Sequence, residues 1–242
     1  MITGLILAAL IACTPSSGDA ANPGQGLPWA TLSGTLEHGN PDFSLPTAKP
    51  TRSLNPAMFT LLSDNFDDPE SGWPVYQDEY GSSVYSRGAY EIESIQEKYY
   101  AWRTAGLNVD NVRIDVDVRI RKTNSEKNDG FGVDCRIQEN GDGYGFRISS
   151  DGYISISLYV DLEPISLLEW QENAFVNIDG RVNHIAAVCQ ADQFTFFVND
   201  VQVAQVMDDT FTSGDVALSV ISFTDQTVSV AFDNLTVRQI SD

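Results

Sequence analysis

The chain has 242 residues, of which 34 are acidic and 14 are basic, giving a formal net charge of −20. A surface this acidic repels phosphate backbones, which argues against nucleic acid as a partner. The length is sufficient for one domain with a sizeable core. The 3 cysteines and 2 histidines show no spacing typical of a structural zinc site.

The N-terminal segment has the pattern of a lipid-attachment signal. Leu5 to Ala12 is an apolar run, too short to span a membrane, which takes about 20 residues, but typical of the core of a signal peptide. The string Leu10-Ile11-Ala12-Cys13 resembles the lipobox of bacterial lipoproteins, which implies that residues 1–12 are removed and Cys13 is acylated. The protein is then extracytoplasmic and lipid-anchored to the bacterial cell membrane. The alternative is a conventional signal peptide in which Cys13 carries no lipid.

Residues 13–60 have the composition of a linker. Seven of the ten prolines fall between Pro15 and Pro56, among Gly, Ser, Thr and Asn, and apolar residues recur there with no period. A segment of this kind cannot bury enough apolar surface to form a core. We expect it to tether a folded domain to the membrane.

From Leu61 onward the pattern changes to alternation of apolar and polar residues, which is typical of half-buried β-strands. Residues 112–121 alternate without a break, so their apolar side chains are predicted to face the core and their charged side chains to face out. Further strands are predicted at 131–138, 144–148, 154–158, 183–190, 194–198, 201–206, 216–222, 228–232 and 235–237. No segment has a helical period of useful length. Residues 61–242 are therefore predicted to form an all-β, antiparallel sandwich.

Cys135 and Cys189 are the two cysteines that remain once Cys13 is assigned to lipid attachment. Both lie in predicted strands, and an exported protein occupies a compartment that permits oxidation, so we expect them to form a disulfide. The alternative is a pair of separate buried thiols.

Short motifs with turn glycines and aromatic residues span the predicted sandwich. They are Asp64-Asn-Phe-Asp-Asp-Pro-Glu-Ser-Gly-Trp73, Gly88-Ala-Tyr90, Phe131-Gly-Val133, Gly143-Tyr-Gly-Phe146, Gly152-Tyr153 and Phe232-Asp-Asn-Leu-Thr-Val237. Together they resemble concanavalin A-like lectin/glucanase jelly rolls, in particular the laminin-G-like and 3-keto-disaccharide hydrolase domains of secreted bacterial proteins. The resemblance implies a jelly-roll β-sandwich in which one sheet face is concave and accepts sugars. It assigns no activity, because a fold does not imply a function.

One face of the predicted sheet carries the residues expected to bind a ligand. If the apolar residues of 131–138 face the core, alternation places the intervening side chains of this strand and of the next two on the outer face. Such a face would hold a polysaccharide or another glycan by aromatic stacking and hydrogen bonds. The predicted ligand-binding residues are Asp134, Arg136, Arg147, Tyr153 and Tyr159, with Trp102 from a preceding segment. The alternatives are an ordinary solvated sheet face and, for Trp102, a place in the core.

A structural calcium ion is a further expectation from the resemblance, because jelly rolls of this kind often bind one where the first and last strands meet. The resemblance places Asp64, Asp67, Asp68 and Asp233 near that junction. Ca²⁺ takes about six to eight oxygen ligands, so backbone carbonyls would have to complete the site. The alternative is that these aspartates cap turns.

Catalysis has less support in the sequence. Glucanases of this fold use acidic residues that alternate along one strand and flank the scissile bond. The similar string here, with Glu91, Glu93 and Glu97, lacks the spacing and the aspartate of that motif. Of the two histidines, His38 falls in the linker and His184 in a predicted strand, where we expect a core or interface residue.

The sequence therefore favours a membrane-anchored lipoprotein with a non-catalytic, carbohydrate-binding β-sandwich. Two other functions stay open. One is a structural or adhesive cell-envelope protein that contacts other proteins, and the other is an enzyme that acts on glycosides.

Overall fold

The computed structural model describes residues 57–97, 99–124 and 126–241. The signal segment, Cys13 and the linker up to residue 56 lie outside this range, so lipid attachment stays a prediction. Within the described ranges all regular secondary structure consists of β-strands, which confirms the all-β prediction. Accordingly, these ranges hold no helix that is long and apolar enough to cross a membrane.

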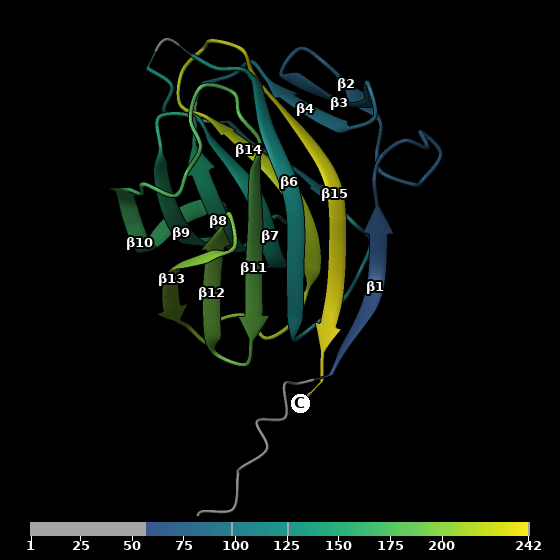
Figure 1. Cartoon of the computed structure of the whole chain (residues 1–242), viewed down its shortest axis with the longest axis vertical. Helices are drawn as coiled ribbons and strands as arrows, with labels where there is room; N and C mark the ends of the chain where they lie inside the picture. Colours follow the sequence, from purple (N-terminus) through teal and green to yellow (C-terminus); the bar gives the residue numbers. More distant parts are fainter. Residues whose placement is uncertain (1–56, 98, 125, 242) are drawn as a thin grey trace, which may run out of the picture. The chain divides into compact units, whose positions relative to one another are not determined.

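The larger of two sheets has nine antiparallel strands (Figure 1). These strands are β1 (Met58–Asp64), β2 (Tyr76–Gln77), β3 (Gly81–Tyr85), β4 (Tyr90–Ser94), β6 (Val112–Lys122), β11 (Asn183–Gln190), β12 (Gln193–Val198), β13 (Val201–Met207) and β15 (Val228–Ile240). Eight of them follow the order β13-β12-β11-β6-β15-β4-β3-β2, and β1 pairs with β15 off this path. Strand β15 is long enough to pair with β4 along its first half and with β1 along its second half.

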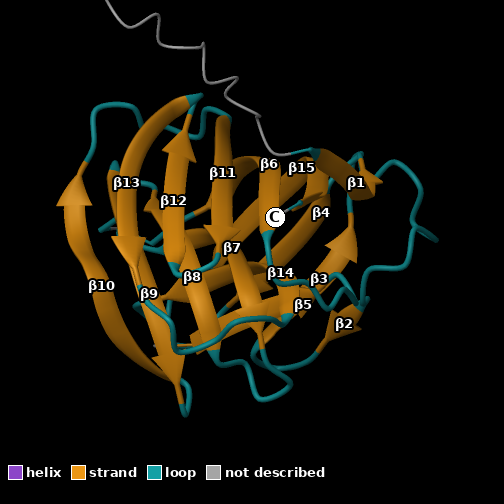
Figure 2. Cartoon of the chain, turned by 90° about the horizontal axis from the view of Figure 1, so that it is seen from below, coloured by secondary structure: helices purple, strands orange, loops and turns teal. Residues whose placement is uncertain are grey.

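The smaller sheet has six antiparallel strands in the order β10-β9-β8-β7-β14-β5. They are β5 (Tyr99–Thr104), β7 (Gly130–Ile137), β8 (Gly143–Ser149), β9 (Tyr153–Val160), β10 (Glu163–Glu172) and β14 (Asp215–Ser222). Figure 2 shows the two sheets stacked as layers. Two antiparallel sheets packed face to face form a β-sandwich, as the sequence predicted.

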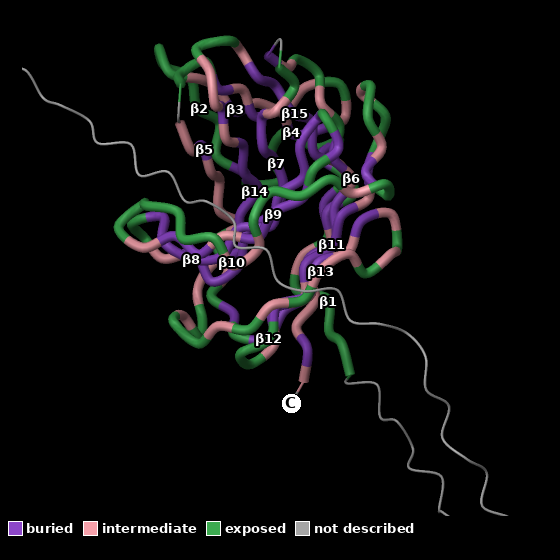
Figure 3. Tube along the Cα trace, turned by 90° about the vertical axis from the view of Figure 1, so that its left-hand side faces the viewer, coloured by how far each residue is buried: buried purple, intermediate pink, exposed green. Residues whose placement is uncertain are grey.

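The core lies between the sheets and follows from the alternation along the strands. Every second residue of β6 from Val112 to Val118 is fully buried, and so is every second residue of β8 from Tyr144 to Ile148. In Figure 3 the buried residues follow the strands of both layers, while exposed residues gather in the connections. Burial of these apolar side chains is the main stabilising contribution to the fold.

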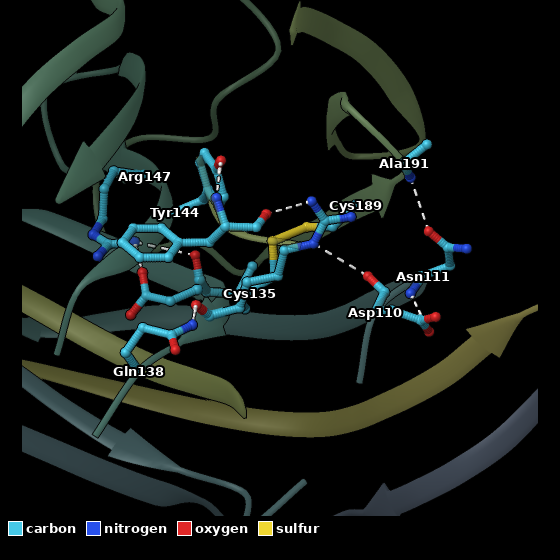
Figure 4. Close-up of a disulfide and its surroundings, with 12 residues drawn as sticks. Asp110, Asn111, Cys135, Gln138, Tyr144, Arg147, Cys189 and Ala191 are labelled. Carbon is cyan, nitrogen blue, oxygen red and sulfur yellow. Dashed lines mark hydrogen bonds and ion pairs between the residues drawn. A yellow bond between two sulfur atoms is a disulfide. The ribbon is translucent and has the colours of Figure 1, made fainter. Parts of the chain in front are cut away.

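The predicted disulfide between Cys135 and Cys189 is confirmed. Cys135 belongs to β7 of the smaller sheet and Cys189 to β11 of the larger one, so the bond joins the two layers (Figure 4). Beside it, the backbone N–H of Ala191 donates a hydrogen bond of 2.8 Å to the side chain of Asn111. The bridge therefore ties the two sheets together near the ends of β7 and β11.

The strands differ from the sequence prediction in three respects. Strands β1 to β5 all precede residue 112, where the first predicted strand begins. Strand β1 begins at Met58, so the sandwich includes residues 58–60, which were assigned to the linker. Strand β10 was not predicted, because its residues are mostly exposed and do not alternate, and its pairing with β9 shifts register twice. A strand with such irregularities has no clean two-residue period to detect.

Candidate functional site

Glycines occupy several of the outward positions at the centre of the outer face of the smaller sheet. Gly132 pairs with Arg147, Gly145 with Asp134 and Gly130 with Ser149, so each outward pair contains one glycine. A Cβ added at Gly145 would lie 2.7 to 2.9 Å from the guanidinium of Arg147. The glycines therefore leave room for larger side chains to lie flat across the sheet.

Arg147 and Asp134 form an ion pair in this space. Their side chains are 1% and 0% exposed, and Nη1 of Arg147 contacts the carboxylate of Asp134. The same nitrogen donates a hydrogen bond of 3.1 Å to the backbone oxygen of Val133. Burial alone would lower the pKa of Arg147, but the carboxylate of Asp134 raises it above its ordinary value. The guanidinium of Arg147 thus stays charged, with the carboxylate of Asp134 as its ion-pair partner.

Aromatic side chains cover this pair. The hydroxyl of Tyr100 donates a hydrogen bond of 2.8 Å to Asp134, and its ring lies 4.8 Å from that of Tyr159 at an interplanar angle of 8°. Trp102 stacks with Tyr100 at 5.0 Å between ring centroids. The guanidinium of Arg147 lies 5.5 Å from the centre of the Tyr100 ring, within the range of a cation–π interaction. Burial raises the pKa of Tyr100 and of Tyr159, so both hydroxyls stay protonated at neutral pH.

These contacts require the smaller sheet to be curved. Strands β5 and β9 are four strand spacings apart in the sheet, which is roughly 19 Å in a flat sheet. Yet Tyr100 of β5 stacks on Tyr159 of β9. From the edge strand β10, the ring of Trp170 comes within about 3 Å of where a Cβ of Gly130 on β7 would be, and it contacts Phe223 edge-on at 6.2 Å. The outer face is therefore concave.

The concave face contains two adjoining hollows. The first, the Tyr159 hollow, has a volume of about 480 Å³ and is lined by, among others, Tyr100, Ser155, Ser157, Tyr159, Glu163 and Trp170. The second, the Tyr153 hollow, has a volume of about 320 Å³ and is lined by Asn128, Ser149, Asp151, Tyr153, Trp170 and Phe223. Trp170 and Phe223 line both, so the hollows form one groove with an aromatic ridge between them. We call this the concave groove.

Two neighbouring residues in the floor of the groove have polar atoms without a partner. The hydroxyl of Ser155 is buried, with the residue 2% exposed, and it has no hydrogen-bond partner among the described residues. On its cross-strand partner, Nε and Nη2 of Arg147 are also unpaired within the described part of the chain. A buried polar group without a partner costs about 1–3 kcal/mol, so such atoms mark a place where water or a ligand hydroxyl would bind.

Five of the six predicted ligand-binding residues lie on this face. Tyr153 and Tyr159 line the two hollows, and Trp102 stacks on Tyr100. Asp134 and Arg147 were expected on an open face, but they are fully buried under the aromatic side chains. They support the groove from below and do not line it.

The prediction for Arg136 is wrong. Its φ of 55° and the register shift between β7 and β14 mark a bulge, which ends the alternation. The guanidinium turns away from the groove, lies 5.0 Å from the ring centre of Phe194 of the larger sheet, and donates to the backbone oxygens of Asp110 and Phe211. Arg136 therefore closes one end of the sandwich.

Tyr100, Trp170 and Phe223 belong to the groove but were not predicted from the sequence. Tyr100 shares parity with Trp102 on β5, a signal that could have found it. Trp170 and Phe223 gave no such signal, since Trp170 lies in the irregular strand β10 and Phe223 follows the end of β14.

The aspartates predicted to bind calcium do lie near the junction of the first and last strands, where Asp64 pairs with Leu235. Asp64, Asp68 and Asp233 each accept a hydrogen bond from a backbone N–H one or two residues further along, as turn-capping residues do. Asp67 accepts one from the side chain of a neighbouring asparagine. The described residues contain no group of three or more His, Cys, Asp or Glu side chains placed to hold a metal ion. Calcium binding stays a prediction that this arrangement does not support.

The acidic string and His184 lie on the other sheet, away from the groove. Glu91 and Glu93 of β4 bind Ser229 of the neighbouring strand β15 and Lys122 at the end of β6. His184 was expected in the core or an interface, but its side chain is 36% exposed and lies 3.6 Å from Asp115 and 2.8 Å from Asp117. The carboxylates of Asp115 and Asp117, that of Asp115 first, raise the pKa of His184 to about 9. A histidine that is protonated at neutral pH cannot act as a general base.

Comparison with known proteins adds information about the fold. No protein-family model and no curated protein matches the sequence. Among solved structures, a galectin-like protein of unknown function from Bacillus subtilis is 9% identical, with 76% of this chain and 97% of that chain covered and a TM-score of 0.56. The catalytic domain of an endo-1,3-beta-glucanase from Thermotoga petrophila is 9% identical, with coverages of 77% and 100% and a TM-score of 0.55. LamAcat from Zobellia galactanivorans is 14% identical, with coverages of 74% and 97% and a TM-score of 0.51.

These similarities confirm the jelly-roll β-sandwich of the concanavalin A-like and galectin-like type. At 9% to 14% identity they establish the fold alone. The function of the groove follows from the geometry and chemistry of its own residues.

Proposed function

We propose that this chain is a non-catalytic carbohydrate-binding protein, held outside the cell by a lipid on Cys13, which binds glycans in the concave groove. The observation that carries the proposal is the lining of the groove. Tyr159, Trp170 and Tyr153 present aromatic surface along its length, and serine hydroxyls lie between them. Sugars offer both apolar C–H faces and hydroxyl groups, so they suit a pocket of aromatic surface with a few placed polar groups.

The positions of the carboxylates support a non-catalytic role. Glycoside hydrolysis uses two carboxyl groups about 5–10 Å apart on either side of the scissile bond. Among the described lining residues the acidic side chains are Asp151 and Glu163. They flank opposite ends of β9, roughly 20 Å apart at the rise of an extended strand. Two carboxylates at that distance cannot act on the same glycosidic bond.

The lipid anchor fits a display function. The lipobox-like string that ends at Cys13 and the proline-rich linker that follows it would hold the sandwich away from the membrane. Replacement of Cys13 by Ser is expected to move the protein from the membrane fraction to the soluble fraction of the producing bacterium. Retention of the Cys13→Ser variant in the membrane fraction would contradict lipid anchoring through this residue.

A glycan array probed with the full chain tests the carbohydrate-binding proposal. We expect binding to one group of related glycans, and we expect Trp170→Ala to weaken it about tenfold or more, since truncation of a central aromatic anchor removes at least ~1.4 kcal/mol. The matched control is Phe59→Ala, an exposed aromatic residue of β1 on the other sheet, which should leave binding unchanged.

Two results would contradict the proposal. If Trp170→Ala binds as well as the parent, the glycan site lies elsewhere on the molecule. If the array is silent while the full chain self-associates or captures envelope proteins, the structural or adhesive function replaces carbohydrate binding.

A further inference from the structure

The two hollows of the concave groove are arranged in line. They lie on either side of Trp170 and Phe223, and both open along strand β9. Tyr153 and Tyr159 stand on the same face of this strand, six residues apart, which corresponds to about 20 Å at 3.3 Å per residue. A single sugar ring is much shorter than this, so it could occupy one hollow but not both.

The lining of the groove carries an excess of negative charge. Its described lining residues include the carboxylates of Asp151 and Glu163 and no lysine, arginine or histidine. The guanidinium of Arg147 lies close by, but it is buried and its charge is cancelled by Asp134. The whole chain carries a formal charge of −20. An anionic ligand would therefore meet repulsion with no cation in the described lining to offset it.

Apart from these two carboxylates, the polar groups that line the groove are neutral hydrogen-bonding groups. The Tyr159 hollow has Ser155 and Ser157, and the Tyr153 hollow has Asn128 and Ser149. The unpaired hydroxyl of Ser155 is satisfied when a ligand hydroxyl comes within hydrogen-bond distance. The carboxylates can also accept hydrogen bonds from sugar hydroxyls, which are charge-assisted and stronger than neutral ones.

We infer that the concave groove binds a neutral glycan chain of at least two sugar units, which runs along β9 and crosses the ridge formed by Trp170 and Phe223. Acidic polysaccharides and single sugars are the ligands that this geometry disfavours. The inference rests on the proposed function, because it names the class of glycan for the same groove.

The first test is an array that pairs neutral glycans of one to six units with glycans that carry uronic acid, sulfate or sialic acid. We expect the full chain to bind neutral chains of two or more units. Binding that is confined to acidic glycans, or equal affinity for a monosaccharide and its oligomers, would overturn the inference while leaving carbohydrate binding in place. Silence on the whole array would overturn the proposed function as well.

The second test uses titration calorimetry with the best neutral series, one unit at a time. Affinity should rise with chain length until both hollows are filled and then level off. Tyr153→Ala should abolish the gain from the additional units, a loss of about tenfold, and leave the affinity for the shortest bound member unchanged. Ser157→Ala should weaken short and long members equally, since Ser157 belongs to the Tyr159 hollow alone. Phe59→Ala serves as the control.

If Tyr153→Ala affects all chain lengths equally, or none, the hollows do not act as consecutive sites and the inference is wrong. Ionic strength gives an independent readout. A neutral ligand should bind with nearly the same affinity at low and high salt, because screening acts on charge pairs. Affinity that falls steeply with added salt would indicate an ionic contact that the groove is inferred to lack.

Discussion

The ion pair of Arg147 and Asp134 gives the sharpest test of the architecture beneath the groove. Replacement of Arg147 by Met keeps the length of the side chain but leaves the carboxylate of Asp134, which is 0% exposed, without its counter-charge. Of the hydrogen bonds to this carboxylate, the one donated by the Tyr100 hydroxyl would remain. Breaking a buried pair by removal of one partner costs about 3–5 kcal/mol, because an uncompensated buried charge is left behind.

For a domain of this size, a decrease of 1 kcal/mol in the free energy of unfolding lowers Tm by about 2–4 °C. Arg147→Met is therefore expected to lower Tm by about 6–20 °C. Urea unfolding followed by tryptophan fluorescence measures the free energy directly. The double variant Arg147→Met/Asp134→Leu removes both charges and should recover most of the loss, since replacing a whole buried pair by apolar residues is often neutral. These two variants separate the effect of charge from the effect of packing.

The parent and Arg147→Met are compared by urea unfolding at pH 7. If the single variant unfolds within about 1 kcal/mol of the parent at pH 7, the pair is not buried and the account of the groove floor fails.

Two further predictions concern other parts of the molecule. Removal of the disulfide by Cys135→Ala/Cys189→Ala should cost about 4 kcal/mol in urea unfolding, because the bond spans 54 residues of sequence and links the two sheets; a loss well below 1 kcal/mol would show that the bridge does not constrain the chain. The carboxylates of Asp115 and Asp117 raise the pKa of His184 from 6.5 to about 9, so protonated His184 contributes stability that is fully present below pH 6.5 and is lost as pH rises through 9. Unfolding free energies between pH 6 and 10 should show this decline in the parent and a flatter profile in His184→Gln, and identical profiles would contradict the raised pKa.

The class of fold and much of the core could be predicted from local patterns in the sequence. Alternation over residues 112–121 predicted β6 and the face it buries, and the same pattern located β7, β11 and β14 within one or two residues of their ends. The pairing of Cys135 with Cys189 also followed from composition. These features depend on the local period of apolar residues and on the number of cysteines, and both can be read from the sequence.

Which of the outward residues form a site depends on contacts that only the tertiary structure contains. Alternation placed Arg136 on the outer face with Arg147, but a bulge in β7 turns its side chain toward Phe194 of the larger sheet. Tyr100 and Tyr159 are 59 positions apart in the sequence, and they stack because the smaller sheet is curved. Trp170 reaches the centre of the groove from an edge strand whose register shifts hide it from pattern analysis. Curvature and bulges arise from contacts between distant strands, so a two-residue period identifies the face on which a side chain starts but not what covers it or what it contacts.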